Sequence, residues 1–409
     1  MAEGTKTFEY AVRDREGKIV KGRLEATDQA AVANKLKSIG VAPVSIEEVS
    51  TSGLNAEFTI PGFKEKIKQK DLAIMGRQMA TMIDSGLSLL RALSIVSEQT
   101  ENKPLAKTLV HVRNDVEQGV AFSVALAKHP DVFPPLMINM VKAGEVGGFL
   151  DQVLVSVADN FEAEVKLRGQ IKSAMTYPVV VFVIAILATV GMLLFIVPVF
   201  ESMFSDLGGK LPAPTQFLVT LSQGLKWAIG PVVAGLIVFS WWWGKHKNDK
   251  VIRQRVDPLK LKIPVFGKLF QKVAVARFTR NFGTMLRSGV PILQALDIVG
   301  ETSGNLVLEK AAHSVQESVR AGQSLAGPLS MHPVFPPMVV QMMAVGEDTG
   351  ALDTMLEKVA QFYDQEVEAT TEQLTSLIEP LMIVVIGGVV GSMIIALYLP
   401  IFSMFDLVG

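Results

Sequence analysis

The longest apolar stretch of the chain runs from Pro178 to Phe200 and holds no charged residue over 23 positions. At about 1.5 Å rise per residue, a helix of this length crosses a hydrocarbon core of about 30 Å. A buried helix of a soluble protein would carry a polar stripe, which the run VVVFVIAILATVGMLLFIV lacks. The pattern therefore predicts a transmembrane helix, with bounds at residues 177–201.

Two further apolar stretches predict a second transmembrane helix at residues 224–243 and a third at residues 379–402. The second stretch closes on three tryptophans at residues 241–243, as at a membrane interface. A share of 49% hydrophobic residues fits a chain that lies partly in lipid.

The charges around these stretches predict the orientation of the chain. Basic residues precede the first predicted span and follow the second: Lys166, Arg168, Lys172, Lys245, Lys247, Lys250, Arg253 and Arg255. The positive-inside rule then places the N-terminus in the cytoplasm, and three spans leave the C-terminus outside. We expect an external loop at residues 202–223, a basic cytoplasmic connector at 244–269 and an external C-terminal tail at 403–409.

Ahead of the first span, residues 65–176 carry apolar positions at helical spacing in six short segments. Helix signals separate the segments: Pro104 suits a first helical turn, whereas Gly119 and the pair Gly147-Gly148 suit helix ends. Because strand signals are scarce in between, the sequence predicts an all-α bundle of six helices.

The N-terminal segment has a different pattern. The stretches TFEYAVRD and KIVKGRLEA alternate apolar and polar positions on either side of Gly17, which predicts a hairpin, and a helix at 27–38 and a third strand follow. We therefore expect a small α+β module at residues 1–50. Residues 51–64 are polar and interrupted by glycine and proline, which predicts a flexible linker.

An internal repeat organises the chain. At an offset of 203 residues, and of 202 after the loss of one residue, predicted turn positions recur in pairs: Gly86 with Gly289, Pro134 with Pro336, and Gly144 with Gly346. The repeated unit is the bundle plus the span after it, so a second six-helix bundle is predicted at residues 270–378. The fold class is an all-α membrane protein with two tandem six-helix cytoplasmic bundles, three transmembrane helices and the small N-terminal α+β module.

Few residues of the chain point to chemistry. The sequence has no cysteine, no Walker A, HExxH or GxSxG motif, and no charged residue in the interior of a predicted span that would mark an ion or proton path. With 39 basic and 40 acidic residues, the chain also lacks the basic excess of a nucleic-acid-binding protein. We therefore expect no catalytic residue, no cofactor and no nucleic-acid partner, and we predict that the protein is not an enzyme.

Four carboxylates recur in a fixed setting: Glu145, Asp151, Glu347 and Asp353. They lie in the sequences GEVGGFLD and GEDTGALD, which predict glycine-flanked turns between helices. A carboxylate there can accept hydrogen bonds from free helix amides. As weak metal candidates, the same oxygens can bind a hard cation. The sequence leaves both roles open.

Small residues form helix faces on two of the predicted spans. Pairs spaced four apart lie on the third span and the second: Gly387 with Gly391, Gly388 with Ser392, and Gly230 with Ala234. Such faces allow helices to approach closely in lipid, although glycine is also common in spans without such a role.

These features together resemble the inner-membrane platform proteins of type IV pilus assembly and type II secretion, the PilC and GspF family. The resemblance covers nearly the whole chain and rests on the duplicated unit, the paired SGL and SGV turns, the paired FPP loops, the GE-x-x-G turns and the three spans. It implies a non-enzymatic, multi-pass platform in the bacterial plasma membrane. Such a platform couples a cytoplasmic hexameric ATPase to the insertion or extraction of pilin subunits.

The resemblance also implies the partners. The two bundles would contact the hexameric assembly ATPase, and the spans would contact pilin or pseudopilin through their small-residue faces. Other inner-membrane pilus or secretion proteins and further copies of the chain complete the set. Pilus assembly and type II secretion both stay open. A transporter or transmembrane signalling component is the alternative from another class, although a transporter would show polar or discontinuous spans.

Overall fold

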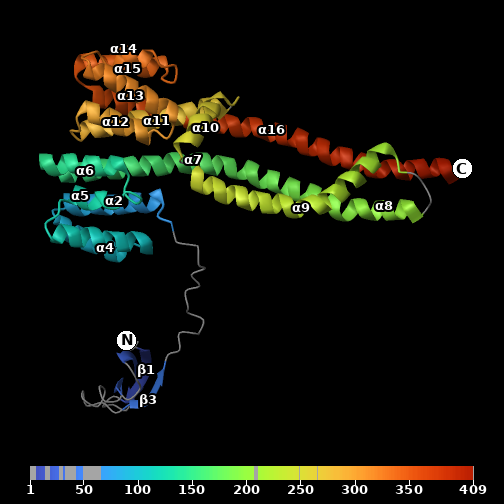
Figure 1. Cartoon of the computed structure of the whole chain (residues 1–409), viewed down its shortest axis with the longest axis horizontal. Helices are drawn as coiled ribbons and strands as arrows, with labels where there is room; N and C mark the ends of the chain where they lie inside the picture. Colours follow the sequence, from blue (N-terminus) through green and yellow to red (C-terminus); the bar gives the residue numbers. More distant parts are fainter. Residues whose placement is uncertain are drawn as a thin grey trace. The chain divides into compact units, whose positions relative to one another are not determined.

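The computed structural model describes residues 6–13, 19–26, 31–32, 43–48, 66–206, 211–247, 249–264 and 266–408. It divides into two compact units, residues 1–65 and residues 66–409, which we describe separately. Figure 1 shows the course of the chain through both units.

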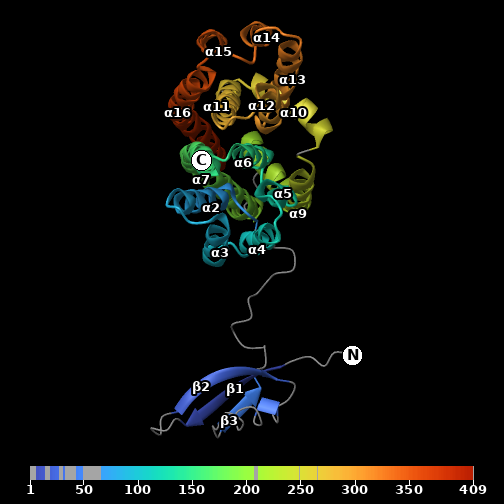
Figure 2. The ribbon, with the colours of Figure 1, turned by 90° about the vertical axis from the view of Figure 1, so that its left-hand side faces the viewer.

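The first unit contains a three-stranded antiparallel sheet with the strand order β2-β1-β3 (Figure 2). Its strands are β1 (Lys6–Arg13), β2 (Ile19–Ala26) and β3 (Pro43–Glu48). The predicted hairpin is therefore present, with Phe8 of β1 opposite Leu24 of β2. The predicted helix lies outside the described residues except at 31–32, and the predicted linker lies outside them entirely. The α+β assignment of this module and the linker stay predictions.

The second unit begins with a six-helix bundle, as the sequence predicts. Its helices are α2 (Gln69–Asp84), α3 (Leu89–Gln99), α4 (Lys103–Glu117), α5 (Phe122–Ala127), α6 (Pro135–Gly147) and the first part of α7 (Leu150–Gly191). Apolar positions at helical spacing point inward, so that Met75, Met79 and Phe122 are almost completely buried.

The repeat predicted from the sequence builds a second bundle with the same order of helices. These are α11 (Phe266–Arg287), α12 (Ile292–Thr302), α13 (Leu306–Arg320), α14 (Ala326–Ser330), α15 (Pro337–Thr349) and the first part of α16 (Leu352–Val408). The two bundles share one apolar core, and α6 and α7 of the first contact α11 and α12 of the second (Figure 2).

Local backbone chemistry ends and starts the helices at matched positions. Gly86 and Gly289 adopt φ of +87° and +69° in the turns after α2 and α11, a region that favours glycine. Pro134 and Pro336 are the N-cap residues of α6 and α15, each followed by a proline in the first helical turn, where no amide hydrogen is needed.

The structure corrects the assignment of Gly144 and Gly346 as turn residues. Both lie inside helices, α6 and α15, and the left-handed residue that ends each helix is instead Gly148 or Gly350. A Cβ atom on Gly144 would lie 2.8 Å from Cγ2 of Val153, and one on Gly346 would meet the following helix equally closely. Glycine is therefore required here because two helices approach closely, and not because the chain turns.

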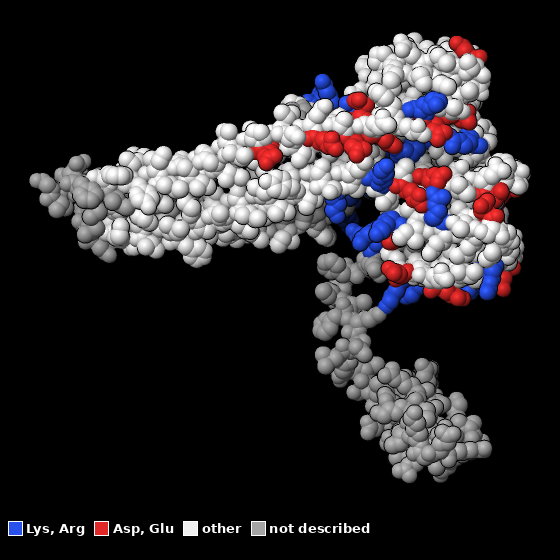
Figure 3. Space-filling model, turned by 180° about the vertical axis from the view of Figure 1, so that it is seen from behind, with Lys and Arg blue, Asp and Glu red and all other residues white. Residues whose placement is uncertain are grey.

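Among the residues that the structure describes, three helices are long and apolar enough to cross a membrane: Leu150–Phe204, Ala213–His246 and Leu352–Pro400. The first comprises α7, a π-helical turn (Met192–Ile196) and part of α8 (Val197–Asp206). Pro198 has no amide hydrogen to donate to the carbonyl four residues earlier. The π-helical turn ends at Ile196, just before this proline, where such a break in the hydrogen-bond pattern is expected. In Figure 3 the visible side of the three apolar helices is almost free of charged side chains, which gather on and next to the bundles.

Three connecting segments are more helical than predicted. The predicted external loop at 202–223 contains the end of α8 and the start of α9 (Ala213–His246). The predicted connector at 244–269 contains α10 (Lys250–Lys262) and the start of α11, and α16 continues into the predicted tail, to Val408. The predicted helices end where the apolar runs end. An amphipathic helix, such as the first turns of α9, continues through polar positions.

Candidate functional site

A repeated ion pair ties the first helix of each bundle to the last. Nε of Arg77 in α2 lies 2.7 Å from Oε1 of Glu162 in α7, and the Arg77 guanidinium also contacts Asp159 at 2.5 Å. In the second bundle, Arg280 of α11 pairs in the same way with Asp364 of α16. The hydrogen bond from Arg77 lowers the pKa of Glu162 below its ordinary value, so this pair is charged at neutral pH.

Polar contacts also join the two bundles to each other. Glu164 of α7 accepts hydrogen bonds or ion-pair contacts from Arg277 of α11 at 2.6 and 3.0 Å and from Arg168 at 2.7 Å. Burial lowers the pKa of Arg277, and the charge of Glu164 acts against that shift. Nearby, the buried amide of Asn160 donates to Oδ1 of Asn281 at 3.0 Å. These contacts fix α7 of the first repeat against α11 of the second.

A cavity of about 190 Å³ lies between α7, α11 and α16. Four of its five charged side chains form opposite pairs, Arg280 with Asp364 and Arg287 with Glu357, and the fifth, Asp159, contacts Arg77 of α2. A polar groove of about 330 Å³ continues from it along α7 and α16. Because each of these charged groups already faces a partner of opposite charge, the cavity is a polar seam that holds the three helices together.

A small apolar cluster closes this seam on the side of the spans. It consists of Leu167, Leu269, Val367 and Leu374, from α7, α11 and α16. Each of these side chains is almost fully buried, so the two long helices leave the bundles packed against the same part of α11. This packing joins the two long helices to α11 where they leave the bundles.

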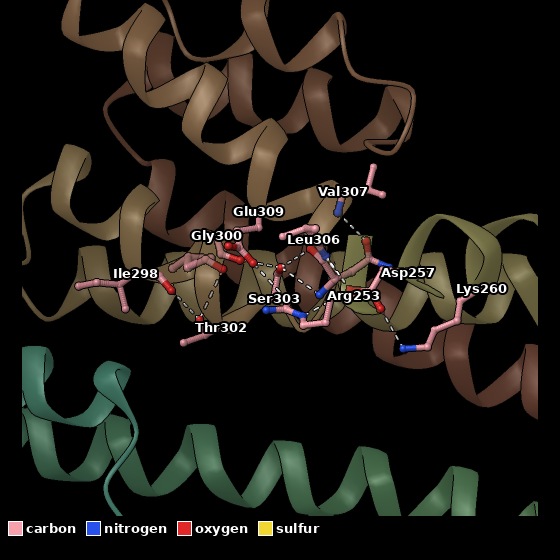
Figure 4. A network of polar contacts seen from close by, with 12 residues as sticks. Arg253, Asp257, Lys260, Ile298, Gly300, Thr302, Ser303, Leu306, Val307 and Glu309 are labelled. Atoms are coloured by element: carbon pink, nitrogen blue, oxygen red, sulfur yellow. Dashed lines mark hydrogen bonds and ion pairs between the residues drawn. The ribbon is translucent and has the colours of Figure 1, made fainter. Parts of the chain in front are cut away.

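A second polar network fixes the helix that follows α9 (Figure 4). Asp257 of α10 is 2% exposed and accepts hydrogen bonds from Lys260 at 2.9 Å and from the backbone amide of Leu306 at 3.0 Å. Arg253 of the same helix contacts Glu309 of α13 at 3.2 Å. The Asp257 carboxylate thus satisfies a free amide at the start of α13. Through this network the second bundle holds α10, the helix that follows α9 in the chain.

The far ends of the three apolar helices are also joined. The hydroxyl of Thr215 in α9 donates to the carbonyl of Ala396 in α16. In a regular helix that carbonyl would accept from the amide of residue 400, but residue 400 is proline and has no amide hydrogen. Apolar side chains surround this contact, among them Leu193, Leu218 and Leu397.

The repeated glutamates cap helices, but not in the turns where the sequence placed them. Glu145 lies in the last turn of α6, and its carboxylate accepts from the amides of Phe122 and Ser123 at 2.5 and 2.9 Å, at the start of α5. Glu347 of α15 accepts from the amide of Leu325, at the start of α14, with both oxygens at 2.9 Å. The carboxylate acts as a cap for a helix that begins 22 or 23 residues earlier in the chain.

The two aspartates lie apart from this role. Asp151 and Asp353 stand in the first turns of α7 and α16, where a negative charge favours the helix dipole. Among the residues that the structure describes, no group of three or more histidine, aspartate or glutamate side chains is placed to hold a metal ion. The geometry thus supports the capping role of these carboxylates over the cation site.

The predicted small-residue faces point away from the rest of the chain. A Cβ atom added to Gly230, Gly387, Gly388 or Gly391 would meet no atom within 4 Å. Ala234 and Ser392 are exposed as well. The structure therefore leaves these faces open, and contact with a pilin stays a prediction.

Sequence reasoning missed most of the polar contacts. Glu162 and Asp364 could have been found, because both are acidic at the offset of 202 and their partners Arg77 and Arg280 recur at 203. Asp257 has no matching residue in the other repeat, and the Glu164–Arg277 contact joins different repeats. Such contacts depend on tertiary packing and have no signal in a single sequence.

Comparisons with known proteins agree with the duplicated architecture. The family model described as "Type II secretion system (T2SS), protein F" matches residues 76–198 and again residues 278–400. A model described as the N-terminal domain of that protein matches residues 1–47. The two main matches fall on the two repeats.

Curated relatives cover nearly the full chain. The chain is 45% identical over 406 residues to the type IV pilus assembly protein PilC of Myxococcus xanthus, covering 98% of this chain and 96% of the relative. It is 45% identical over 401 residues to PilC of Thermus thermophilus, with 97% of each chain covered. It is also 34% identical over 404 residues to the type II secretion system protein F of Vibrio cholerae, with 98% and 99% covered.

Proposed function

Because the chain belongs to the type II secretion system protein F family, we propose that it is an inner-membrane platform of a pilus or secretion machine. The finer proposal is that it couples a cytoplasmic hexameric ATPase to the insertion or extraction of pilin subunits. The bundles then face the cytoplasm, and the three apolar helices cross the plasma membrane with the C-terminus outside.

The observation that carries this proposal is the continuity of two helices. α7 runs without a break from the first bundle to Gly191, and α16 runs from the second bundle to Val408. Both helices are anchored in the bundles by the repeated ion pairs of Arg77 and Arg280. A force applied to a bundle therefore reaches its span through one stiff element.

Pilus assembly is the favoured system. The two PilC relatives are 45% identical to this chain, whereas the protein F relative from Vibrio cholerae is 34% identical. The partners of the platform are accordingly pilin subunits in the membrane and an assembly ATPase below it. A type II secretion system with its pseudopilins is the second candidate.

The proposed platform does no chemistry of its own. In the part of the chain that the structure describes, the polar cavity between α7, α11 and α16 is lined by arginine and carboxylate side chains that already form ion pairs. Energy then has to come from the ATPase. The bundles, which carry almost all the charged side chains visible in Figure 3, are the surfaces that would receive it.

The test inserts a flexible linker into α7 between the first bundle and the apolar run. A Gly-Ser linker inserted after Ser173 lies beyond the apolar cluster of Leu167 and before the apolar run that starts at Pro178. We expect this variant to insert into the membrane and bind the ATPase, while pilus or secretion output falls to the background of a deletion strain. ATP hydrolysis and fibre assembly should be measured in the same cells.

The matched control carries the same linker after Lys247, at the break between α9 and α10, where no continuous helix is interrupted. Its output should stay near that of the parent. Normal assembly by the Ser173 insertion would contradict rigid coupling and would make the protein a passive anchor. Equal loss in both insertions would show that added length alone is harmful.

A further inference from the structure

The helix α10 joins the apolar helix α9 to the second bundle, and it begins close to the end of α9. That end, at His246, follows three tryptophans at residues 241–243, a residue type that favours the boundary between lipid and water. The Nζ atom of Lys245 lies 5.9 Å from the centre of the Trp241 ring. From His246 to Lys250, where α10 begins, four residues span at most about 14 Å. The first turn of α10 therefore lies near the lipid headgroups.

One face of α10 is held against the second bundle (Figure 4). The buried carboxylate of Asp257 lies 2.9 Å from Nζ of Lys260 and 3.5 Å from Nε of Arg253. Arg253 also contacts Glu309 of α13 at 3.2 Å, and Leu261 packs against the apolar core of the bundles. Both cations of this face therefore already have carboxylate partners within the chain.

The opposite face of α10 combines apolar and basic side chains. At 3.6 residues per turn, four residues lie on the side of the helix turned away from Asp257: Val251, Arg255, Leu259 and Lys262. We call these four residues the outward face of α10. All four are exposed, the valine at 69% and the leucine at 66%. Among the residues that the structure describes, neither Arg255 nor Lys262 has an ion pair or a side-chain hydrogen bond.

An anionic lipid surface suits both kinds of side chain on the outward face. An amphipathic helix in the plane of a membrane interface buries its apolar side chains at the boundary of headgroups and acyl chains, while lysine and arginine contact the anionic headgroups. Anionic lipids attract basic residues within a Debye length, about 8–10 Å at physiological salt. Lys247 and Lys250 are exposed too and continue the basic surface toward α9. An acidic protein would suit the cations, but the apolar side chains so close to a span favour lipid.

We propose that the outward face of α10 binds the headgroups of anionic phospholipids. Arg255 and Lys262 contact the phosphate groups. Val251 and Leu259 enter the layer where headgroups meet acyl chains. Because the other face of α10 is fixed through Asp257, this contact holds the second bundle at the membrane surface. The inference goes beyond the platform role and depends only on α9 crossing the membrane.

The absence of cysteine allows a single label on the outward face. The full chain carrying L259C is labelled with the fluorophore NBD and placed in nanodiscs of phosphatidylcholine alone, or of phosphatidylcholine and phosphatidylglycerol in equal parts. Lipids that carry a nitroxide near the headgroup end of the acyl chain quench a fluorophore that enters this layer. We expect about threefold stronger quenching in the anionic nanodiscs, and added salt should reduce the difference.

The matched control for the label is V146C. Val146 is apolar and 84% exposed, and it lies in the last turn of α6. The next helix, α7, begins at Leu150 and runs about 40 Å before it reaches the apolar run at Pro178. A label at position 146 should therefore show the same weak quenching in both kinds of nanodisc.

Charge reversal tests the two cations directly. In the L259C background, R255E/K262E should remove the preference for anionic nanodiscs. The control K107E/K142E makes the same change of net charge at two exposed lysines of the first bundle and should keep the preference. Circular dichroism reports whether each variant keeps its helices. If the reversal reduces the helix content, the neutral variant R255Q/K262Q gives the same comparison without adding acidic groups.

Several results would overturn the proposal. These are equal quenching of L259C in the two kinds of nanodisc, equal quenching at V146C in the anionic nanodiscs, or the same loss of preference in both charge-reversal variants. Soluble iodide, which quenches labels that face water, provides a second measurement. A label at position 259 that becomes protected from iodide only when purified assembly ATPase is added would identify a protein as the occupant and reject lipid binding.

Discussion

At the scale of single residues, one carboxylate in each repeat performs the same task. Glu145 and Glu347 each reach from the end of one helix to the amides of a short helix that has no capping side chain of its own. The sequence showed that the residues recur, and it allowed two roles for them, helix capping and cation binding. It could not show the capped helix, because the amides lie about 22 residues away and only the packing of α5 on α6 brings them close.

Replacing Glu145 by alanine should lower the free energy of unfolding by about 0.5–2 kcal/mol, the usual cost of a lost cap. Added calcium should change neither protein. Denaturant unfolding in detergent measures the difference, and Glu117→Ala is the control because Glu117 is exposed and lies in the last turn of α4. A calcium-dependent rise in the melting temperature of the parent that is lost in E145A would contradict the capping role.

The ion pair of Arg77 and Glu162 gives a prediction about pH. Its hydrogen bond lowers the pKa of Glu162 in the folded protein below the ordinary 4.5. The pair therefore stabilises the fold above pH 4.5, and that contribution is lost as the pH falls through the lowered pKa. The melting temperature of E162Q, measured between about pH 3 and 6, should fall less steeply with acid than that of the parent. Parallel curves for the two proteins would refute this.

At the scale of helices, proline and glycine residues made the helix starts and ends predictable from the sequence. Helix starts at Pro135 and Pro337 and stops at Gly148 and Gly350 follow from the backbone chemistry of these residues, and the predicted bundles agree with the structure. The segment predicted as a loop at 202–223 is partly helical, because α8 continues to Asp206 and α9 begins at Ala213 with an amphipathic stretch rather than an apolar one. A threshold on apolar length cannot detect such a start.

The joint between α9 and α16 can be tested by a double-mutant cycle. Thr215→Val removes the hydroxyl that serves the carbonyl of Ala396, which should destabilise the membrane region by about 0.6 kcal/mol, the average for such bonds in lipid. In a Pro400→Ala background the helix regains an amide hydrogen at position 400, so the same replacement should cost less. Unfolding of reconstituted protein in mixed micelles measures both. Equal costs in the two backgrounds would show that the proline is irrelevant to this contact.

At the scale of the whole molecule, the sequence predicted two bundles but not their arrangement. The offset of about 200 residues is a signal of duplication and says nothing about which faces of the repeats touch. Across the contact surface α7 packs on its counterpart α16, and α6 and α7 of the first repeat also face α11 and α12 of the second. Residues such as Asn160 and Asn281, which meet there, occupy different positions in their repeats.

The contact surface between the two bundles also matters while the chain is being synthesised. Asn160 and its partner Asn281 are 121 residues apart. At a synthesis rate of about 5–20 residues per second, Asn160 is therefore made about 6–24 s before Asn281. Two apolar helices enter the membrane during this interval. Until the second bundle emerges, the first presents Asn160 and Glu164 to water, which hydrates an amide and a carboxylate readily. A nascent chain whose waiting surface carries such polar groups is less prone to aggregate than one that exposes an apolar surface alone.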